Sequence, residues 1–582
     1  MHRLRLLPLV LAATLLAACG TGRPPGDLDP EGPKGPDEPQ PRVLAVAPTA
    51  ALPGATVTIT GEALGAAGAV RLGGLAADVV AWSPEAITIE VPDGAPPAWQ
   101  PLLVTPDDGG EAEAELFVGV AFTGPESELR DALAALEAGT HLLLPSGTLA
   151  LPGSELVLDG VHLHGHPDGT TLALGASGVA VLVGRGGAAG LTGVEVHGAY
   201  FTFRVPGAGG IVPIALAADE EPGDEPTTVH LERLTFVGGS FGLDAYMTGA
   251  TARIHLKDSR LVADGIIDLP GEGAVEVTGS QVLAGSVTVA SSSGPVTIAG
   301  SVLTGRSLTS VVAAERIEVR GSTLTATDGN VSLHATGMGM ADLVEGSLLV
   351  TGSELEARET PMNGLPDAYS GDIVLTAYGG TIEVLDNPRV QAHDGVEIRA
   401  LGFDERTSEA RVEGNAFLAR GVRLVSERAQ ASFVGNSVTH AGPVEALLSL
   451  SGLEATVDVS GNTFTVTDDP GPTATGLRLE AQNGYLSLEG EGNVFTNLSR
   501  AFHVTLHDAT LDGAFTHNVF DFPIEQAPAA GYFVVTGSHA SLDLSGTRWG
   551  AVTDSAALAD LMEVLVDMES QLTLRLDPLV TD

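Results

Sequence analysis

The chain has 582 residues, among them 74 glycines and 35 prolines, and its formal net charge is −46. A surface this acidic repels nucleic acids and anionic membranes, so both are excluded as partners. Few aromatic residues and many turn-forming and β-branched residues favour strands over helices, and the length suits two domains or an elongated repeat array.

The first 18 residues have the pattern of a signal peptide. Arg3 and Arg5 precede an apolar run, Leu6–Ala18, that is too short to span a bilayer as a mature helix. The run ends in LAACG at residues 16–20, which resembles the lipobox of bacterial lipoproteins, where cleavage before the cysteine frees it for lipidation. The resemblance implies a protein held in the cell envelope, outside the cytoplasm, by a lipid on Cys19. That lipid would be its only contact with a membrane.

Residues 19–41 are rich in proline and glycine and nearly devoid of apolar side chains. Such a composition cannot bury a core, and it favours extended polyproline II conformation. We therefore expect a disordered linker that holds the folded part away from the membrane.

Residues 42–120 contain short apolar alternations separated by proline and glycine, which predict six or seven strands in a small β-sandwich. Their order, P…G..VTITG..LG…V.LGG…V..WSP..I.I.VP, resembles the IPT/TIG family of immunoglobulin-like modules. The match runs through Pro48, Gly54, Gly61, Gly65, Trp82 and Pro92. The resemblance implies a spacer or protein-contact domain and not an enzyme.

The region from residue 121 to 582 repeats itself. After a helix expected over residues 127–139, a serine recurs every 21 residues at four positions, and the series continues less regularly with Ser or Asn. A period this short is too small for a propeller blade or a two-helix repeat and suits one turn of a parallel β-helix. The members of the series are Ser259, Ser280, Ser301, Ser322, Ser353, Asn387, Asn415, Asn436, Asn462, Asn493, Asn518 and Thr547.

Two roles follow for this repeat. We expect each Ser or Asn at a bend, where asparagine tolerates a left-handed backbone and side chains hydrogen-bond along the stack. The apolar residue two positions later should face inward, so that Phe464, Phe495 and Phe520 stack in register.

This half of the chain resembles the right-handed, pectate-lyase-like β-helix family. The resemblance lies in repeated V.V.GN.F units, the expected cap helix, the stretch HLLLPSGTLALPG, and the ending SGTRWG followed by a helix expected over Asp554–Met568. The predicted fold class is therefore all-β: an immunoglobulin-like β-sandwich, then a right-handed parallel β-helix with short N- and C-terminal helices.

No catalytic residue is assigned. The family's polygalacturonase pattern requires Asn-Thr-Asp, Asp-Asp, Gly-His-Gly and Arg-Ile-Lys on successive turns, and this series does not occur here in order. Pectate lyases pair acidic calcium ligands with a basic residue, and we interpret Lys257, the one lysine in the repeats, as a solvated charge. The long insertion at residues 357–372, with Asp367 and Asp372, leaves open an enzyme whose catalytic residues lie on loops.

Outward positions after the bends suggest a possible ligand face. It comprises Glu397, Arg423, Arg478 and His503, and Glu397 should pair with Arg423 one turn away. A purely structural ladder of charges is the alternative interpretation.

Two other clusters could hold metal, and neither is assigned as a site. His162, His164 and His166 alternate in VHLHGH, so we expect them on the solvent-facing side of one strand, and zinc would need further ligands. The loop at residues 218–226 is dense in the oxygen ligands that Ca²⁺ prefers, although we favour a solvated loop. Calcium is the one cofactor left open, on Asp219, Glu220, Glu221, Asp224 and Glu225.

These features predict a cell-envelope surface lipoprotein with a non-catalytic binding or adhesion rod that contacts an extracellular glycan or protein. A polysaccharide lyase or glycoside hydrolase is one alternative, and a structural envelope component is another. The β-helix fold does not decide among them, since one fold hosts many functions.

Overall fold

The computed structural model describes residues 40–580 except 49, 97, 123, 125, 137–139, 152–154, 160, 167, 175–178, 184–187, 205–226, 244–251, 272, 337–344, 360–370, 403–406, 469–473, 522–529, 551 and 578. The described chain is nearly all β-strand, as the composition predicts. The predictions for the signal peptide, Cys19, most of the linker, the acidic loop and Asp367 lie outside the described residues.

The N-terminal unit consists of two small sheets that share one core. Alternating residues such as those of TVTITGE point inward, so that Val57 and Ile59 of one sheet face Leu102 and Val104 of the other. The indole N–H of Trp82 donates to the carbonyls of Leu64 and Gly65, each at 3.1 Å. In spatial order the sheets are β1 (Arg42–Ala47), β3 (Thr56–Glu62), β7 (Ala86–Glu90), β6 (Asp78–Trp82), and β2 (Ala50–Ala51), β9 (Ala112–Val118), β8 (Ala98–Pro106), β4 (Gly68–Leu72), β5 (Leu75–Ala76).

A short helix follows, α1 (Glu126–Ala134), and it is shorter than the predicted 127–139. Leu129 and Leu133 are buried against the next part of the chain, as its apolar spacing predicts. The helix ends early because its last turn tightens: the N–H of Leu136 bonds to the carbonyl of Leu133, three residues back, at 3.4 Å.

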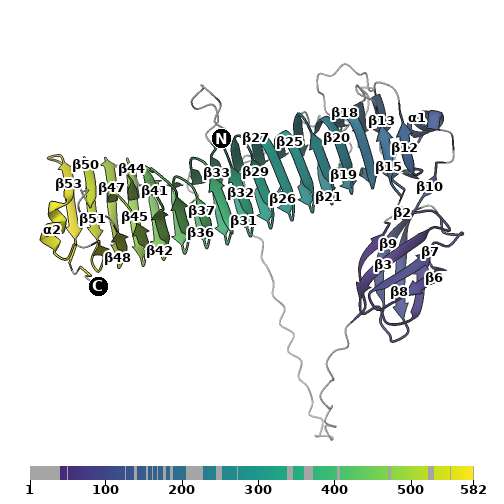
Figure 1. Ribbon diagram of the computed structural model, residues 1–582, viewed down its shortest axis with the longest axis horizontal. Helices are drawn as coiled ribbons and strands as arrows, with labels where there is room; N and C mark the ends of the chain where they lie inside the picture. The colour runs from purple at the N-terminus through teal and green to yellow at the C-terminus, as the bar shows by residue number, and fades with distance from the viewer. Residues whose placement is uncertain are drawn as a thin grey trace, which may run out of the picture.

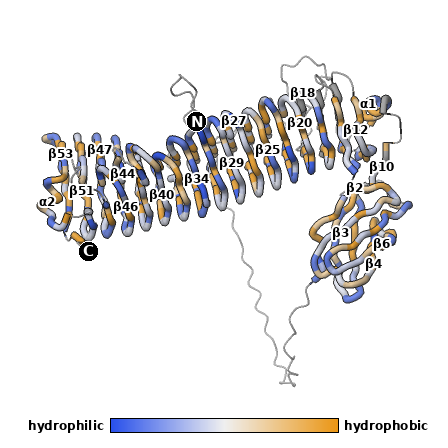
Figure 2. The backbone as a smooth tube through the Cα atoms, in the orientation of Figure 1, coloured by the Kyte–Doolittle hydropathy of each residue, from blue (hydrophilic) through white to orange (hydrophobic). Residues whose placement is uncertain are grey.

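The rest of the chain forms one 45-stranded array of parallel strands, β10 (Val120–Ala121) to β54 (Gln571–Arg575), drawn as a long stack in Figure 1. The chain passes repeatedly through three rows of strands, and each strand pairs with the strand of the next pass in the same row. Val275, Val296 and Ile317 are one such set of partners in three successive passes. Polar and apolar residues alternate along the strands (Figure 2), and the apolar ones of all three rows meet in a continuous core.

The first row follows β10 and contains β11 (His141–Leu143), β14 (His162–His164), β17 (Ala188–Thr192), β19 (Thr227–Glu232), β21 (Ala252–Lys257), β24 (Val275–Thr278), β26 (Val296–Ala299), β28 (Arg316–Arg320), β31 (Gly346–Thr351), the end of β33 (Ile373–Leu385), β36 (Ser408–Glu413), β39 (Ala429–Val434), β42 (Ala455–Ser460), β45 (Tyr485–Glu491), β48 (Thr510–Thr516), β51 (His539–Asp543) and β54.

The second row contains β12 (Gly147–Ala150), β15 (Thr170–Ala173), the starts of β18 (Val194–Arg204), β20 (Thr235–Leu243), β25 (Gln281–Ser291) and β27 (Val302–Ala313), and β22 (Arg260–Ala263), β29 (Thr323–Ala326), β32 (Glu354–Ala357), β34 (Arg389–Ala392), β37 (Ala416–Leu418), β40 (Ser437–His440), β43 (Thr463–Val466), β46 (Val494–Thr496), β49 (Val519–Asp521) and β52 (Arg548–Trp549).

The third row contains β13 (Glu155–Asp159), β16 (Val179–Val183), the ends of β18, β20, β25 and β27, β23 (Ile266–Gly271), β30 (Asn330–Ala335), the start of β33, β35 (Val396–Leu401), β38 (Val422–Glu427), β41 (Ala446–Leu453), β44 (Thr475–Gln482), β47 (Arg500–His507), β50 (Gly531–Thr536) and β53 (Met562–Val566).

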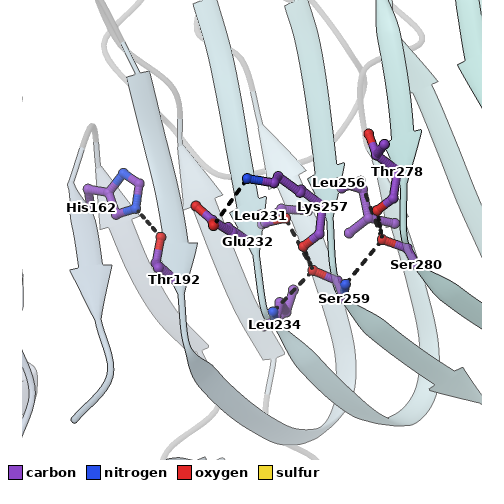
Figure 3. A network of polar contacts seen from close by, with 10 residues as sticks. All are labelled: His162, Thr192, Leu231, Glu232, Leu234, Leu256, Lys257, Ser259, Thr278 and Ser280. Carbon is purple, nitrogen blue, oxygen red and sulfur yellow. Dashed lines mark hydrogen bonds and ion pairs between the residues drawn. The ribbon is translucent and has the colours of Figure 1, made fainter. Parts of the chain in front are cut away.

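The Ser/Asn series lies at the bend between the first and second rows, as predicted, and the structure shows that it is buried. The N–H of Ser259 donates to Oγ of Ser280 at 3.1 Å, and the N–H of Ser280 donates to Oγ of Ser301 at the same distance; Figure 3 shows the first of these contacts. In the asparagine part of the series, both the backbone N–H and the side-chain amide of Asn436 donate to Oδ1 of Asn462. The expected hydrogen bonding along the stack is confirmed.

The backbone of this bend differs from the prediction in one respect. The left-handed conformation belongs to the residue before each Ser or Asn, as at Gly300 with φ 56° and Gly461 with φ 65°. Glycine takes this conformation without the clash of a Cβ atom, and the following residue is then free to point its side chain along the stack. The expectation that asparagine itself is left-handed is therefore wrong.

The aromatic stack in the second row is confirmed. The rings of Phe464 and Phe495 lie 4.4 Å apart at 5°, and those of Phe495 and Phe520 lie 4.5 Å apart at 11°. Trp549 extends the stack at 5.0 Å from Phe520, and all four side chains are buried. In-register parallel pairing places these rings above one another.

The C-terminal end differs from the predicted helix over Asp554–Met568. Helix α2 covers only Ser555–Asp560, with the Asp554 side chain accepting a hydrogen bond from the N–H of Ala556 at 2.9 Å. Met562–Val566 instead form β53, which pairs with β50, because the last strand edge of the third row offers backbone partners that a helix would leave unused. Neither helix of the described residues is long and apolar enough to cross a membrane.

Candidate histidine-lined groove

Six strands of the first row, β11, β14, β17, β19, β21 and β24, carry two columns of side chains on their outer side. Because the strands are parallel and in register, residues of successive passes lie next to one another. One column is His141, His162, Gly190, His230, His255 and Glu276, and the other is Leu143, His164, Thr192, Glu232, Lys257 and Thr278. These strands and their side chains line a groove of about 410 Å³.

Three histidines gather at the N-terminal end of the groove. His162 and His164 point away from the core, as expected with Val161 and Leu163 inward, but they are not solvated: only 6% and 2% of their surface is exposed. The prediction that they face solvent is therefore wrong. The physical reason is a covering ring: Phe117 of β9, in the N-terminal unit, stacks on His164 at 5.0 Å.

The third histidine of this cluster is His141, which sequence reasoning missed, and not His166. His141 precedes His162 by 21 residues and pairs with it in register, so the repeat period contained a usable signal. The rings of His141, His162 and His164 are mutually stacked, with centroids 4.5 to 5.2 Å apart. His166 lies beyond the strand and contacts the exposed carboxylate of Asp168 at 3.5 Å.

Hydrogen bonds hold all three rings. Nδ1 of His141 and Nε2 of His164 are 2.9 Å apart, and Nε2 of His162 lies 2.8 Å from Oγ1 of Thr192 (Figure 3). Nδ1 of His164 is buried and has no hydrogen-bond partner among the described residues. The cluster thus contains one ring nitrogen whose capacity to bond is unused.

Burial keeps these imidazoles neutral. It lowers the pKa of His162 to about 2, with His164, His141 and His230 adding electrostatic repulsion. Burial likewise lowers the pKa of His164 to about 3, with His141 and Arg233 contributing. The pKa of His141 is also lowered by burial. At neutral pH the rings therefore carry lone pairs and not charges.

Gly190 makes room for this cluster. A Cβ atom there would lie 2.4 Å from the carbonyl oxygen of His230 and 2.7 Å from Cε1 of His162, so any side chain would clash with the backbone of the next pass. Glycine leaves the His162 ring space in a column otherwise filled by side chains.

The other half of the groove combines a ring pair, a histidine–carboxylate contact and one ion pair. His230 and His255 stack at 5.1 Å, and His255 also contacts Glu276 at 2.9 Å. The ammonium of Lys257 lies 3.5 Å from the carboxylate of Glu232, as Figure 3 shows. This half offers flat rings beside donors and acceptors of both charges.

The residues of the predicted ligand face share one outer column of the third row. Glu397 and Arg423 are register partners and form the expected ion pair at 3.6 Å, and Arg478 and His503 are partners further along, with Ser449 between the two pairs. Glu397 also binds Arg399 at 2.6 Å. The ring of His503 meets that of Tyr532 edge-on at 5.1 Å. Within the column Glu397 pairs with Arg423, whereas Arg478 binds Glu480 of its own strand at 2.6 Å.

The long insertion at residues 357–372 was the place left open for catalytic loop residues, and the structure describes only its two ends. Asp372 accepts a hydrogen bond from the N–H of Gly395 at 3.0 Å, which gives it a structural contact. Glu359, His393 and Asp394 lie together nearby, and Arg420 binds Asp394 at 2.9 Å. These groups contact one another at the surface.

No protein-family model matches the chain, and no curated protein matches it. Short segments resemble solved structures: the gamma-CGTase of an alkalophilic Bacillus clarkii is 27% identical over 14% of this chain and 12% of its own, with a TM-score of 0.13. An auxiliary nutrient binding protein from Bacteroides thetaiotaomicron is 24% identical over 14% and 21% of the two chains, with a TM-score of 0.13. Another from Bacteroides ovatus is 20% identical over 15% and 25%, with a TM-score of 0.12. The chain thus spans a quarter or less of each of these structures, and the matches carry no functional argument.

Proposed function

We propose that this protein is a non-catalytic binding rod of the bacterial cell envelope and that its histidine-lined groove contacts an extracellular ligand. The groove is the observation that carries the proposal. Stacked rings, here His230 and His255, beside hydroxyl and charged groups form the combination of flat and polar surfaces on which small-molecule sites are built. A carbohydrate, with flat apolar ring faces and many hydroxyls, suits this lining best, and a protein segment is the alternative.

The proposal includes the finer architecture. The three rows would be the faces of a right-handed parallel β-helix, supported by the 21-residue period and the parallel pairing of successive passes. The N-terminal unit would be an immunoglobulin-like sandwich of the IPT/TIG kind, supported by its two sheets around one core and by the pattern through Trp82. In this arrangement the sandwich is a spacer and its Phe117 closes the end of the groove.

The cellular location is proposed from the lipobox. Cys19→Ser should move the protein from the membrane fraction to the soluble fraction, because the lipid would be the only anchor. Thr21→Ala, two residues away, should leave it in the membrane fraction. Fractionation followed by immunoblotting measures both, and a Cys19→Ser protein that stays with the membranes contradicts the lipid anchor.

Ligand binding is tested with the full chain carrying Cys19→Ser, on an array of neutral glucans, pectin, alginate and hyaluronan. We expect saturable binding of at least one polysaccharide, and at least a tenfold loss with His255→Ala, equivalent to about 1.4 kcal/mol, because the ring stack and its contact with Glu276 are removed. Arg411→Ala is the matched control, since Arg411 also lies on the outer side of the first row but far from the groove. Equal losses in both variants, or no binding at all, would reject the groove as the binding site and favour a structural envelope component.

A polysaccharide lyase or glycoside hydrolase is the second candidate, and Lys257 favours it. The sequence suggested a solvated charge, and the side chain is 59% exposed, yet it lines the groove beside Glu232 and so places a basic group next to a carboxylate. The protein is therefore also incubated with the same polysaccharides, with and without calcium. The mixtures are assayed for unsaturated products and new reducing ends. Products that disappear with Lys257→Met or Asp372→Ala would replace the binding proposal with catalysis, and binding without product supports it.

A further inference from the structure

We propose that His141, His162 and His164 bind one divalent transition-metal ion, with zinc the best fit. One nitrogen from each ring lies within 4.8 Å of the others. Imidazole nitrogens are preferred zinc ligands, and three protein ligands suffice for a site that keeps a fourth position open. This inference is independent of what the other half of the groove binds.

The spacing of the nitrogens suits coordination. Zinc holds imidazole nitrogen at about 2.0–2.1 Å, so two ligands of a tetrahedral ion lie about 3.3 Å apart. Nδ1 of His141 and Nε2 of His164 are 2.9 Å apart, joined by one shared proton. An ion that replaces this proton has to move the two rings apart by only a few tenths of an ångström.

The unpartnered nitrogen of His164 is a second, independent observation. A neutral imidazole has one donor and one acceptor, and a buried group left without a partner costs about 1–3 kcal/mol. Nδ1 of His164 is in this position among the described residues. The two nitrogens of one imidazole point in different directions, so an ion between His141 and His164 would take Nε2 of His164. The unused Nδ1 shows that the described contacts alone do not satisfy the bonding capacity of this buried ring.

Ring packing alone does not account for the choice of histidine. The four rings of Phe117, His141, His162 and His164 do stack, and such a stack could seal the junction between the N-terminal unit and the strand rows. However, Leu143 holds the position next to His164 in the same column and is buried. An apolar side chain is thus accepted in this environment and would leave no nitrogen unpaired.

Neighbouring residues hold the cluster ready for an ion. Thr192 hydrogen-bonds to His162 and fixes the orientation of its ring, and Gly190 leaves that ring its space. Metal-binding histidines are commonly oriented by such hydrogen bonds from neighbouring residues. His141 is only half-buried and lines the groove, so the groove is a route for an ion from solvent.

The test is titration of the chelator-treated full chain, carrying Cys19→Ser, with Zn²⁺ by calorimetry. We expect one ion per chain with submicromolar affinity, and visible absorption bands of tetrahedral coordination when Co²⁺ is used instead. His141→Gln, His162→Gln and His164→Gln should each weaken binding at least tenfold, since glutamine keeps the size of the side chain but is a poor zinc ligand. His230→Gln and His255→Gln are the matched controls, because both rings line the same groove outside the cluster and should leave the affinity unchanged.

Folding of each variant is checked by circular dichroism and thermal melting without metal. If a buried variant fails to fold, His141→Gln, at the half-buried position, decides the matter. Absence of Zn²⁺ binding by the parent protein, or equal losses in cluster and control variants, overturns the proposal and leaves the rings as a packing stack. If polysaccharide binding is lost with His255→Ala but retained with His141→Gln, the polysaccharide binds independently of the metal site.

Discussion

Replacing Phe495 with alanine is expected to lower the free energy of unfolding by about 3–5 kcal/mol, the usual cost of deleting a buried phenyl ring. The ring is fully buried and lies between two parallel rings, 4.4 Å from Phe464 and 4.5 Å from Phe520. Its neighbours belong to strands fixed by parallel pairing, so they cannot collapse into the space without breaking register. The loss should therefore be at the upper end of this range.

Val494→Ala is the matched control for this change. Val494 adjoins Phe495 in β46 but points outward and is 37% exposed, so its truncation should cost less than about 1 kcal/mol. Urea unfolding followed by tryptophan fluorescence reports on both, since Trp549 continues the same stack. Similar small losses for the two variants would mean that the stacked ring contributes little and that its inward register is wrong.

Because of the repeat, the register of the middle and C-terminal passes could be predicted from the sequence. In a parallel in-register stack, equivalent residues of successive passes are spatial neighbours, so a period in the sequence is directly a register in space. This is why the Ser/Asn column and the phenylalanine stack were predicted correctly. One detail was wrong, because the left-handed residue at the bend is the one before the Ser or Asn, in most passes a glycine such as Gly300.

The histidine cluster depends on a contact that no local pattern encodes. The alternation in VHLHGH gave the correct outward direction of His162 and His164. Their burial comes from neighbouring rings: Phe117, a residue of the N-terminal unit more than forty positions earlier, stacks on His164, and His141 stacks on His162. An outward position was equated with a solvated one, and this fails wherever another part of the chain covers the strand row.

The C-terminal helix was mispredicted for a related reason. In MEVLV, the sequence of β53, polar and apolar residues do not alternate throughout, so this sequence also allowed a helix. The edge of β50 offers a parallel strand pairing over five successive residues, and the backbone hydrogen bonds of this pairing outweigh a weak local preference. The predicted ligand face is different again: the register of Glu397 and Arg423 is as expected, but whether their ladder binds anything stays a prediction.

Replacing Asn462 with alanine is expected to cost about 2–6 kcal/mol, although it removes few atoms. Its Oδ1 accepts the backbone N–H of Asn436 at 2.8 Å, and its Nδ2 donates to the carbonyl of Phe433 at 2.7 Å. Both backbone groups are buried, one in the bend column and the other in β39, so water cannot replace the lost partner. Each buried group left unsatisfied costs about 1–3 kcal/mol. The loss should also spread, because the amide of Asn436 donates to the same Oδ1.

Asn462→Ser separates the hydrogen bonds from the packing. In the serine part of the column, the Ser280 hydroxyl accepts the N–H of Ser259 at 3.1 Å. Its one proton donates to the carbonyl of Thr278 at 2.8 Å and makes only a long contact with the carbonyl of Leu256, at 3.4 Å. Because this contact is longer than the 2.7 Å made by Asn462, serine should recover about half of the stability that alanine loses. Urea midpoints of the three proteins, compared with Val494→Ala, measure the difference. If alanine and serine destabilise the protein equally, the buried ladder does not stabilise the stack through hydrogen bonds, and the serines and asparagines of the column are retained for the shape of the bend alone.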